Sequence, residues 1–260
     1  MTEGRRIGLA SAKGSPGSTT LSLGLGLAAA RVGRQVLVVE ADASGGSLQA
    51  RLGLEPGPGL LSLAAAGRHG ITAKLLAEHL RPLRPGLAVL VAPSDPRQVR
   101  ASLDSLGAAL ADAFGHLSAE GTDVVIDLGR LGVEPAPPLA AGLDQVIWAT
   151  PPTLDGTDAL AVRLGPSGLA PCSAVLTVGD GPYAPEEIAG VLALCLIGDL
   201  PADPTGAGRL WAGLDAPMLW RSPLGRGLGR LADAILPTRP VAEAVRTRRA
   251  TRRLAEAVAP

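Results

Sequence analysis

The chain has 260 residues, of which 47% are hydrophobic, 18% are charged and only 2% are aromatic. This length supports one large α/β domain and is too short for two domains of typical size joined by a linker. Basic and acidic residues number 24 each, so the overall charge does not indicate a nucleic-acid partner. Two cysteines without metal-ligand spacing fit a reduced, cytoplasmic setting, and no apolar run has the length of a signal peptide or a membrane span.

Short apolar runs alternate with longer helical patterns along the chain. Several of these runs are continuously apolar, which suits strands buried on both faces, and their alternation with helices indicates βαβ units. We predict a mostly parallel, twisted sheet with helices on both faces over residues 1–236, followed by a basic C-terminal helix or tail over 237–260. The predicted strands are 7–11, 35–40, 87–92, 123–128, 145–150, 174–177 and 195–197, and the predicted helices are 19–32, 97–114, 154–164 and 185–194.

The first predicted strand leads into a glycine-rich turn, with the sequence IGLASAKGSPGSTT over residues 7–20. Backbone N–H groups of such a turn, together with the positive end of the next helix, can surround phosphate oxygens. The standard phosphate loop G-x-x-x-x-G-K-[ST] is not met, because Ser18 stands at the lysine position. A serine-rich turn without a ligand is therefore the alternative. The candidate phosphate-binding residues are Gly14, Ser15, Gly17, Ser18, Thr19 and Thr20, and the Thr19 hydroxyl is also a candidate Mg²⁺ ligand.

Lys13 is one of only two lysines, against 22 arginines, so composition does not explain a lysine in this loop. Residues 13–20, KGSPGSTT, resemble the variant loop K-G-G-x-G-K-[ST]-[ST] of the ParA/MinD ATPases. The first lysine of that pattern is kept, and Ser18 replaces the second. In that family the first lysine reaches across a dimer interface to the partner's nucleotide. The resemblance therefore implies ATP and Mg²⁺ as ligands, a homodimer that sandwiches nucleotide, and a catalytic role for Lys13.

Acidic residues follow two predicted strands. Residues 35–42, QVLVVEAD, resemble the family segment V-L-L-I-D-x-D, which implies that Glu40 orients metal-bound water and Asp42 positions the attacking water. Residues 122–130, TDVVIDLGR, resemble its Walker B strand, so that Asp127 would hold Mg²⁺ through water and Gly129 would permit a γ-phosphate contact. Taken without the resemblance, Glu40 and Asp42 cap a turn and 122–130 is an ordinary strand ending in a turn.

Three further features refine the resemblance. The D-L-x-R ending of residues 127–130 is closer to the pilus-localising TadZ/CpaE branch than to MinD. Residues 144–158 and 200–213 resemble the family's T-x-P-T strand end and its I-P-x-D segment near the base. Thr177, Val178 and Gly179 stand where the family's asparagine is expected. Together the five matched segments keep the family's order over residues 5–236.

The missing lysine predicts weak ATP binding with slow or absent turnover. Catalysis of phosphoryl transfer is mostly positioning and electrostatics, and losing one such group costs on the order of 3 kcal/mol, which is roughly a hundredfold in rate. We therefore expect a nucleotide-binding positioning protein that localises a machine such as a pilus or secretion assembly. The alternatives are a DNA-binding partition ATPase and a scaffold that works without nucleotide.

The C-terminal segment carries the support for the DNA alternative. Residues 221–260 contain nine arginines against Asp233, Glu243 and Glu256. A solvated arginine face is the plain explanation of such a run, and nonspecific, salt-dependent phosphate contact is the functional one. The segment lacks Phe and Trp, so membrane anchoring is not favoured. The candidate nucleic-acid contacts are Arg246, Arg248, Arg249, Arg252 and Arg253.

Overall fold

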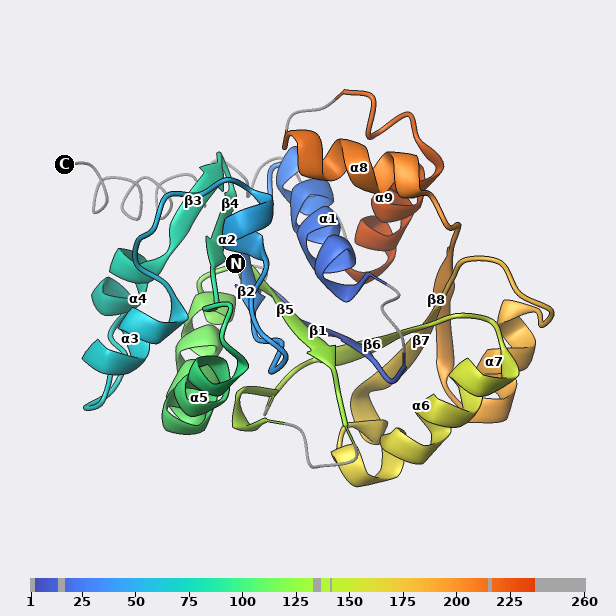
Figure 1. Cartoon of the computed structure of the whole chain (residues 1–260), viewed down its shortest axis with the longest axis horizontal. Helices are drawn as coiled ribbons and strands as arrows, with labels where there is room; N and C mark the ends of the chain where they lie inside the picture. The colour runs from blue at the N-terminus through green and yellow to red at the C-terminus, as the bar shows by residue number, and fades with distance from the viewer. Residues whose placement is uncertain (1–2, 14–16, 133–136, 141, 215–216, 237–260) are drawn as a thin grey trace.

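A computed structural model describes residues 3–13, 17–132, 137–140, 142–214 and 217–236. Its centre is an eight-stranded sheet in the order β3-β4-β2-β5-β1-β6-β7-β8 (Figure 1). All neighbouring strands run parallel except β3 and β4, which are antiparallel. The strands are β1 (Arg6–Ser11), β2 (Gln35–Glu40), β3 (Arg81–Arg84), β4 (Leu87–Leu90), β5 (Thr122–Arg130), β6 (Gln145–Thr150), β7 (Ser173–Val178) and β8 (Cys195–Leu200).

Helices cover both faces of this sheet, as predicted. On one face α1, α8 and α9 pack together, and on the other lie α5, α6 and α7, with α3 beside α5 (Figure 1). Each face has its own core of leucine, valine, isoleucine and alanine. Trp148 is fully buried in the core on the side of α5, α6 and α7. The helices are α1 (Ser18–Arg31), α2 (Leu48–Arg51), α3 (Leu60–Ala66), α4 (Ala73–His79), α5 (Pro96–Ala119), α6 (Leu154–Ser167), α7 (Pro185–Leu192), α8 (Pro204–Ala212) and α9 (Pro223–Ile235).

The seven predicted strands and four predicted helices are all present; the strands predicted over 35–40 and 145–150 have the predicted ends, and the others have shifted ends. The strand predicted over 87–92 ends at Leu90, while the helix predicted over 97–114 continues to Ala119. The sequence analysis missed β3, which has the sequence RPLR. Proline cannot donate a ladder hydrogen bond, so such a short segment is stable only at a sheet edge, where tertiary pairing with β4 holds it. It also missed α2, α3, α4, α8 and α9, several of which are a few residues long and lack a full amphipathic period.

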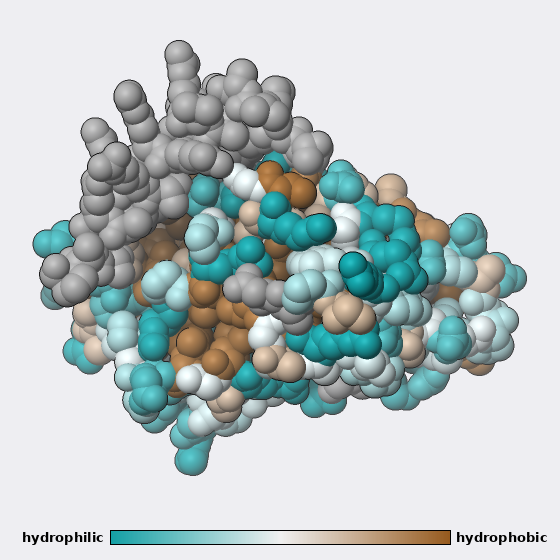
Figure 2. Space-filling model, turned by 90° about the horizontal axis from the view of Figure 1, so that it is seen from above, coloured by the Kyte–Doolittle hydropathy of each residue, from teal (hydrophilic) through white to brown (hydrophobic). Residues whose placement is uncertain are grey.

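The surface of the molecule seen from above is mixed. Figure 2 looks down on the molecule and shows mostly hydrophilic residues, with hydrophobic ones gathered in a hollow between them. Arg51 stacks over Trp211 and Arg31 over Trp220, at 4.7 and 5.1 Å from the ring centroids, so two of the three tryptophans lie under arginines. Among the helices described, none is both long and apolar enough to cross a bilayer.

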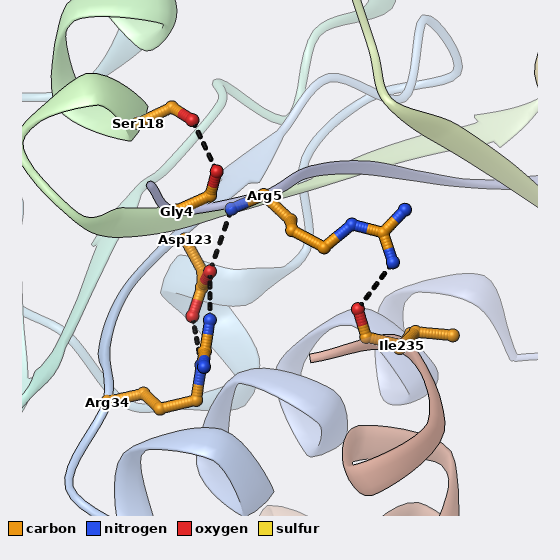
Figure 3. Close-up of polar contacts among 6 residues, drawn as sticks. All are labelled: Gly4, Arg5, Arg34, Ser118, Asp123 and Ile235. Carbon is orange, nitrogen blue, oxygen red and sulfur yellow. Dashed lines mark hydrogen bonds and ion pairs between the residues drawn. The ribbon is translucent and has the colours of Figure 1, made fainter. Parts of the chain in front are cut away.

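A buried ion pair ties the amino ends of the strands to α1 and α9 (Figure 3). Both oxygens of Asp123, at the start of β5, accept hydrogen bonds from the Arg34 guanidinium, and Asp123 also accepts from the Arg5 backbone N–H. The Arg5 guanidinium donates to the carbonyl of Ile235, at the end of α9, over 2.7 Å. Asp123 is fully buried and Arg34 is 5% exposed, so each charge depends on the other for compensation.

Replacing Asp123 with Ala is therefore expected to lower the free energy of unfolding by about 3–5 kcal/mol, because the change leaves the Arg34 guanidinium buried without its carboxylate. Urea denaturation followed by circular dichroism measures this loss. Glu78→Ala is the control, since it breaks the exposed Lys74–Glu78 pair and should change stability little. A loss below about 1 kcal/mol for Asp123→Ala would contradict the interpretation.

Candidate functional site

The glycine-rich turn lies at the carboxyl end of the central strand, where β1 leads into α1. Gly17 has a left-handed backbone, with φ of 86°, and its carbonyl accepts the first helical hydrogen bond, from Leu21. Ser18, Thr19 and Thr20 form the first turn of α1 and are partly exposed. Their N–H groups are among those that a helix leaves without an internal acceptor, so an anion can be bound there. The predicted residues Gly14 and Ser15 lie outside the described residues.

Asp127 stands opposite this helix start, near the end of β5. It is fully buried, and burial raises its pKa from 3.8 to about 6, with the hydroxyl of Thr19 and the N–H of Gly129 acting against that rise. Its Oδ1 accepts from the Gly129 N–H over 3.1 Å. The Thr19 and Ser18 hydroxyls are close enough to stabilise the carboxylate, yet its Oδ2 has no hydrogen bond of normal geometry to any residue described. A buried acceptor without a donor is costly, and a cation or a ligand would relieve that cost.

Asp42 lies against the turn at the end of β5. Its Oδ1 accepts from the Ser44 N–H over 2.7 Å, and its carboxylate packs directly on Gly129. A Cβ at Gly129 would come within 2.0 Å of the Asp42 carboxyl carbon, and Gly129 has a positive φ of 61°. The negative charge of Asp42 also contributes to the raised pKa of Asp127. The two predicted site residues are therefore adjacent.

Glu40 has a different environment. It pairs in register with Asp127 across β2 and β5 and is 1% exposed. Its carboxylate accepts from the N–H groups of Ser47, Leu48 and Ala92. Burial raises the pKa of Glu40, and these hydrogen bonds oppose the rise. The Glu40 carboxylate thus links the loop after β2, in which Asp42 lies, to the start of α2 and to the segment that follows β4. Its role toward metal-bound water stays a prediction.

Lys13 lies at the rim of the site and contacts α6. Its Nζ is 3.1 Å from Oδ2 of Asp155, and both side chains are more than half exposed. The Thr153 hydroxyl and then Lys13 lower the pKa of Asp155. An exposed pair of this kind contributes little stability, so it leaves Lys13 able to move to another anion. The sequence analysis assigned no role to Asp155, because only folding brings α6 to the end of β1.

The residues present fit Mg²⁺ with a phosphate chain, although carboxylates alone do not form a metal cage. Within the described residues, no group of three His, Cys, Asp or Glu side chains is placed to hold a metal ion. Mg²⁺ in nucleotide sites needs only one or two protein ligands, the rest being phosphate oxygens and water. The unsatisfied Oδ2 of Asp127 beside the Thr19 hydroxyl matches that requirement.

Asp203, in the segment 200–213, has a structural role that was not predicted from the sequence. It caps α8 by accepting from the Gly206 N–H over 2.8 Å and also accepts from the Leu224 N–H, at the start of α9, over 3.0 Å. These hydrogen bonds lower its pKa, with Leu224 the larger contributor. Its carboxylate therefore fastens α9 to α8. The five candidate nucleic-acid arginines, from Arg246 to Arg253, lie outside the described residues.

Solved structures of other proteins share this fold. A ParA family ATPase from Chlorobium tepidum superposes with a TM-score of 0.73 at 16% identity, over 89% of this chain and 98% of the other. The septum site-determining protein MinD of Pyrococcus horikoshii, in complex with Mg-ADP, has a TM-score of 0.69 at 20% identity, over 90% and 96%. McdA from Cyanothece, as an ATP complex, has a TM-score of 0.61 at 20% identity, over 89% and 97%.

These similarities show that the chain has the P-loop NTPase fold that is found in the ParA and MinD ATPases. No protein-family model matches the sequence. No curated protein matches it either. The likeness is thus one of backbone architecture at low identity.

Replacing Asp127 with Asn should stabilise the protein at neutral pH. Because the pKa of Asp127 is raised to about 6 in the folded state, its contribution to stability falls as the pH rises from about 4 to about 6. Asn does not ionise, so the variant should exceed wild type by up to about 3 kcal/mol above that range and match it below. Urea unfolding at about pH 4 and about pH 7.5 measures this, with the exposed Asp104→Asn as the surface baseline. A variant less stable than wild type at the higher pH would contradict a raised pKa for Asp127.

Replacing Gly129 with Ala should destabilise the protein by about 1–3 kcal/mol, since the new methyl group meets the Asp42 carboxylate and the backbone is left-handed there. Gly190→Ala, inside α7 with open space around it, is the matched control and should stabilise by up to about 1 kcal/mol. Thermal or urea unfolding of both variants tests the contrast. Equal effects at the two positions would show that Asp42 does not pack on Gly129 in solution.

Proposed function

We propose that this chain is a member of the ParA/MinD superfamily that binds Mg·ATP weakly and hydrolyses it slowly or not at all. One observation carries the proposal: Asp127, buried with an unsatisfied oxygen, lies beside the hydroxyl-rich first turn of α1 at the carboxyl edge of the sheet. In open α/β sheets this edge is where ligands bind. Solved proteins with this fold carry Mg-ADP or ATP, which supports the same class of ligand here.

The roles follow from the position of each group. Backbone N–H groups of residues 14–20 other than Pro16, which has none, would hold the phosphates. Thr19 and Asp127 would hold Mg²⁺, and Asp42 would orient water at the end of the phosphate chain. Bound Mg²⁺, held by Thr19 and Asp127, would supply positive charge to the phosphate chain. It would also favour the ionised form of Asp127, whose burial otherwise favours the protonated one.

Slow turnover follows from Ser18. A hydroxyl at this position can donate one hydrogen bond but brings no charge to the phosphates. Loss of such an electrostatic group costs on the order of 3 kcal/mol in the transition state, or roughly a hundredfold in rate. Ground-state binding depends less on that charge, because backbone N–H groups and Mg²⁺ also contribute to it.

The biological assignments rest on sequence resemblance. We propose that the chain forms a homodimer in which Lys13 leaves Asp155 and reaches the partner's nucleotide, and that it positions a pilus or secretion assembly in the cytoplasm. The exposure of the Lys13–Asp155 pair is compatible with such a change. DNA partition and a nucleotide-independent scaffold are the alternatives, and the C-terminal arginines that would serve the first lie outside the described residues.

Calorimetric titration with Mg·ATP tests the nucleotide proposal. Wild type should bind weakly, and Ser18→Lys should bind at least about tenfold more tightly and hydrolyse roughly a hundredfold faster, because it restores the missing charge. Ser105→Lys, at an exposed position of α5, controls for the added charge and should behave as wild type. The absence of a binding signal for both wild type and Ser18→Lys would remove the proposal.

A further inference from the structure

The outer surface of α6, α7 and the loop before α7, named the α6–α7 surface below, carries most of the exposed large hydrophobic side chains. Of the seven such residues in the described part of the chain, four lie here, namely Leu154, Val162, Tyr183 and Val191. Leu154 is 70% exposed and Val191 is 76% exposed, the two highest values. The helices α6 and α7 pack together on the face of the sheet opposite α1 (Figure 1). Single exposed apolar residues are ordinary, whereas a group of them on two adjacent helices indicates a binding surface.

The α6–α7 surface is also acidic. Residues 144–203 contain eight acidic residues and one basic residue, Arg163, whose guanidinium donates to two backbone carbonyls. Asp158, Glu186 and Glu187 are exposed, and none of them forms an ion pair with any residue that the structure describes. Negative charge disfavours contact with the same surface of a second copy, with nucleic acid and with anionic lipid. The surface therefore suits an occupant that is basic and partly apolar.

The C-terminal end of the chain itself has this character. Residues 237–260, which lie outside the described residues, contain six arginines against Glu243 and Glu256. Apolar or methyl-bearing residues recur there at alternating spacings of three and four, namely Ala244, Thr247, Thr251, Leu254 and Val258. On a helix such positions share one face, and the arginines flank that face. The sequence thus predicts a basic amphipathic helix, which complements an acidic surface with exposed apolar side chains.

The length of this segment suits docking within one molecule. The carbonyl of Ile235, at the end of α9, accepts from Arg5, beside the start of β1, and α6 ends at Ser167, shortly before β7 begins. Both helix ends therefore lie at the amino edge of the sheet, two strands apart and on opposite faces, a distance on the order of 20–25 Å. Residues 237–243 span up to about 23 Å when extended, and residues 244–258 as a helix are about 22 Å long, against about 21 Å for α6.

We infer that residues 244–258 dock as a helix on the α6–α7 surface of the same molecule, with arginines at its carboxylates and Leu254 and Val258 against its exposed apolar side chains. Arg252 and Arg253 lie about 13 Å from the start of such a helix, level with Asp158, which is about 14 Å from the end of α6. The contact engages the C-terminal arginines within the protein and so withholds them from other anions. It does not depend on a bound nucleotide.

Tryptic cleavage of the full-length protein at the C-terminal arginines tests this inference, because the protease acts on the undocked segment. Mass spectrometry of the released peptides gives the cleavage rate. The triple variant Asp158→Asn/Glu186→Gln/Glu187→Gln should be cleaved about fivefold faster than wild type or more, since it neutralises three carboxylates of the α6–α7 surface. About 0.5 M salt should accelerate cleavage of wild type and leave the triple variant nearly unchanged, because the charge pairs that salt screens are already absent there.

Matched controls separate docking from a general effect of charge or polarity. Asp104→Asn/Asp112→Asn/Glu120→Gln removes three exposed carboxylates from α5 and the residue after it, and should be cleaved as wild type. Val191→Ser should accelerate cleavage about twofold or more, because it removes an apolar contact. Val32→Ser, 53% exposed just after α1, should have no effect. All substituted side chains are exposed, and thermal unfolding checks that each variant keeps its fold.

The outcomes are decisive for this contact alone. Equal cleavage of wild type and the triple variant overturns the inference, and so does equal acceleration in the α5 control. Protection that increases with protein concentration shows docking between two copies and overturns the assignment to one molecule. Because these measurements contain no nucleotide, their failure leaves the proposed Mg·ATP site untouched, and a failed Mg·ATP titration leaves the docking contact untouched.

Discussion

The burial of one carboxylate, Asp127, is the constraint on which the rest of this site depends. It lies near the end of β5, between β2 and β1, where parallel pairing excludes water from its side chain. Burial disfavours the charged form of Asp127 and raises its pKa to about 6. Its Oδ2 has no hydrogen bond of normal geometry from any donor among the described residues. A bound cation with a phosphate chain would stabilise the ionised form of Asp127, and this stabilisation would contribute to the binding free energy. The fold thus keeps a destabilised group at the position where a ligand can stabilise it.

Three other carboxylates are used by the protein itself. Asp123, four residues earlier on the same strand, is paired with Arg34 and the Arg5 N–H, and Asp203 caps two helices. Glu40 accepts from three backbone N–H groups. These carboxylates stabilise the frame, whereas Asp127 retains an unused oxygen. The contrast between satisfied and unsatisfied carboxylates distinguishes structural acids from the candidate ligand more clearly than their sequence positions do.

Ser18 stands where a phosphate loop normally has its lysine, and this change affects which groups could neutralise a bound phosphate chain. With Ser18 in the loop, positive charge for a bound phosphate chain would have to come from another cation, such as Lys13 or Mg²⁺. Lys13 is held by an exposed pair with Asp155. A site of this kind can favour binding over turnover.

The sequence by itself determined the layered α/β fold, seven of the eight strands, several of which have continuous apolar runs that suit burial on both faces, and the turn between β1 and α1. It also placed Asp42 and Asp127 at strand ends, because parallel strands bring their carboxyl ends to one edge. Only the tertiary structure decided that Glu40 is consumed by backbone N–H groups, that Lys13 meets Asp155, and that Arg130 lies beside Ser11. Short edge elements such as β3 were equally invisible, since a local pattern cannot report a partner distant in the sequence. Local periodicity encodes burial, whereas hydrogen bonds and charge pairs between distant segments exist only after the sheet has formed.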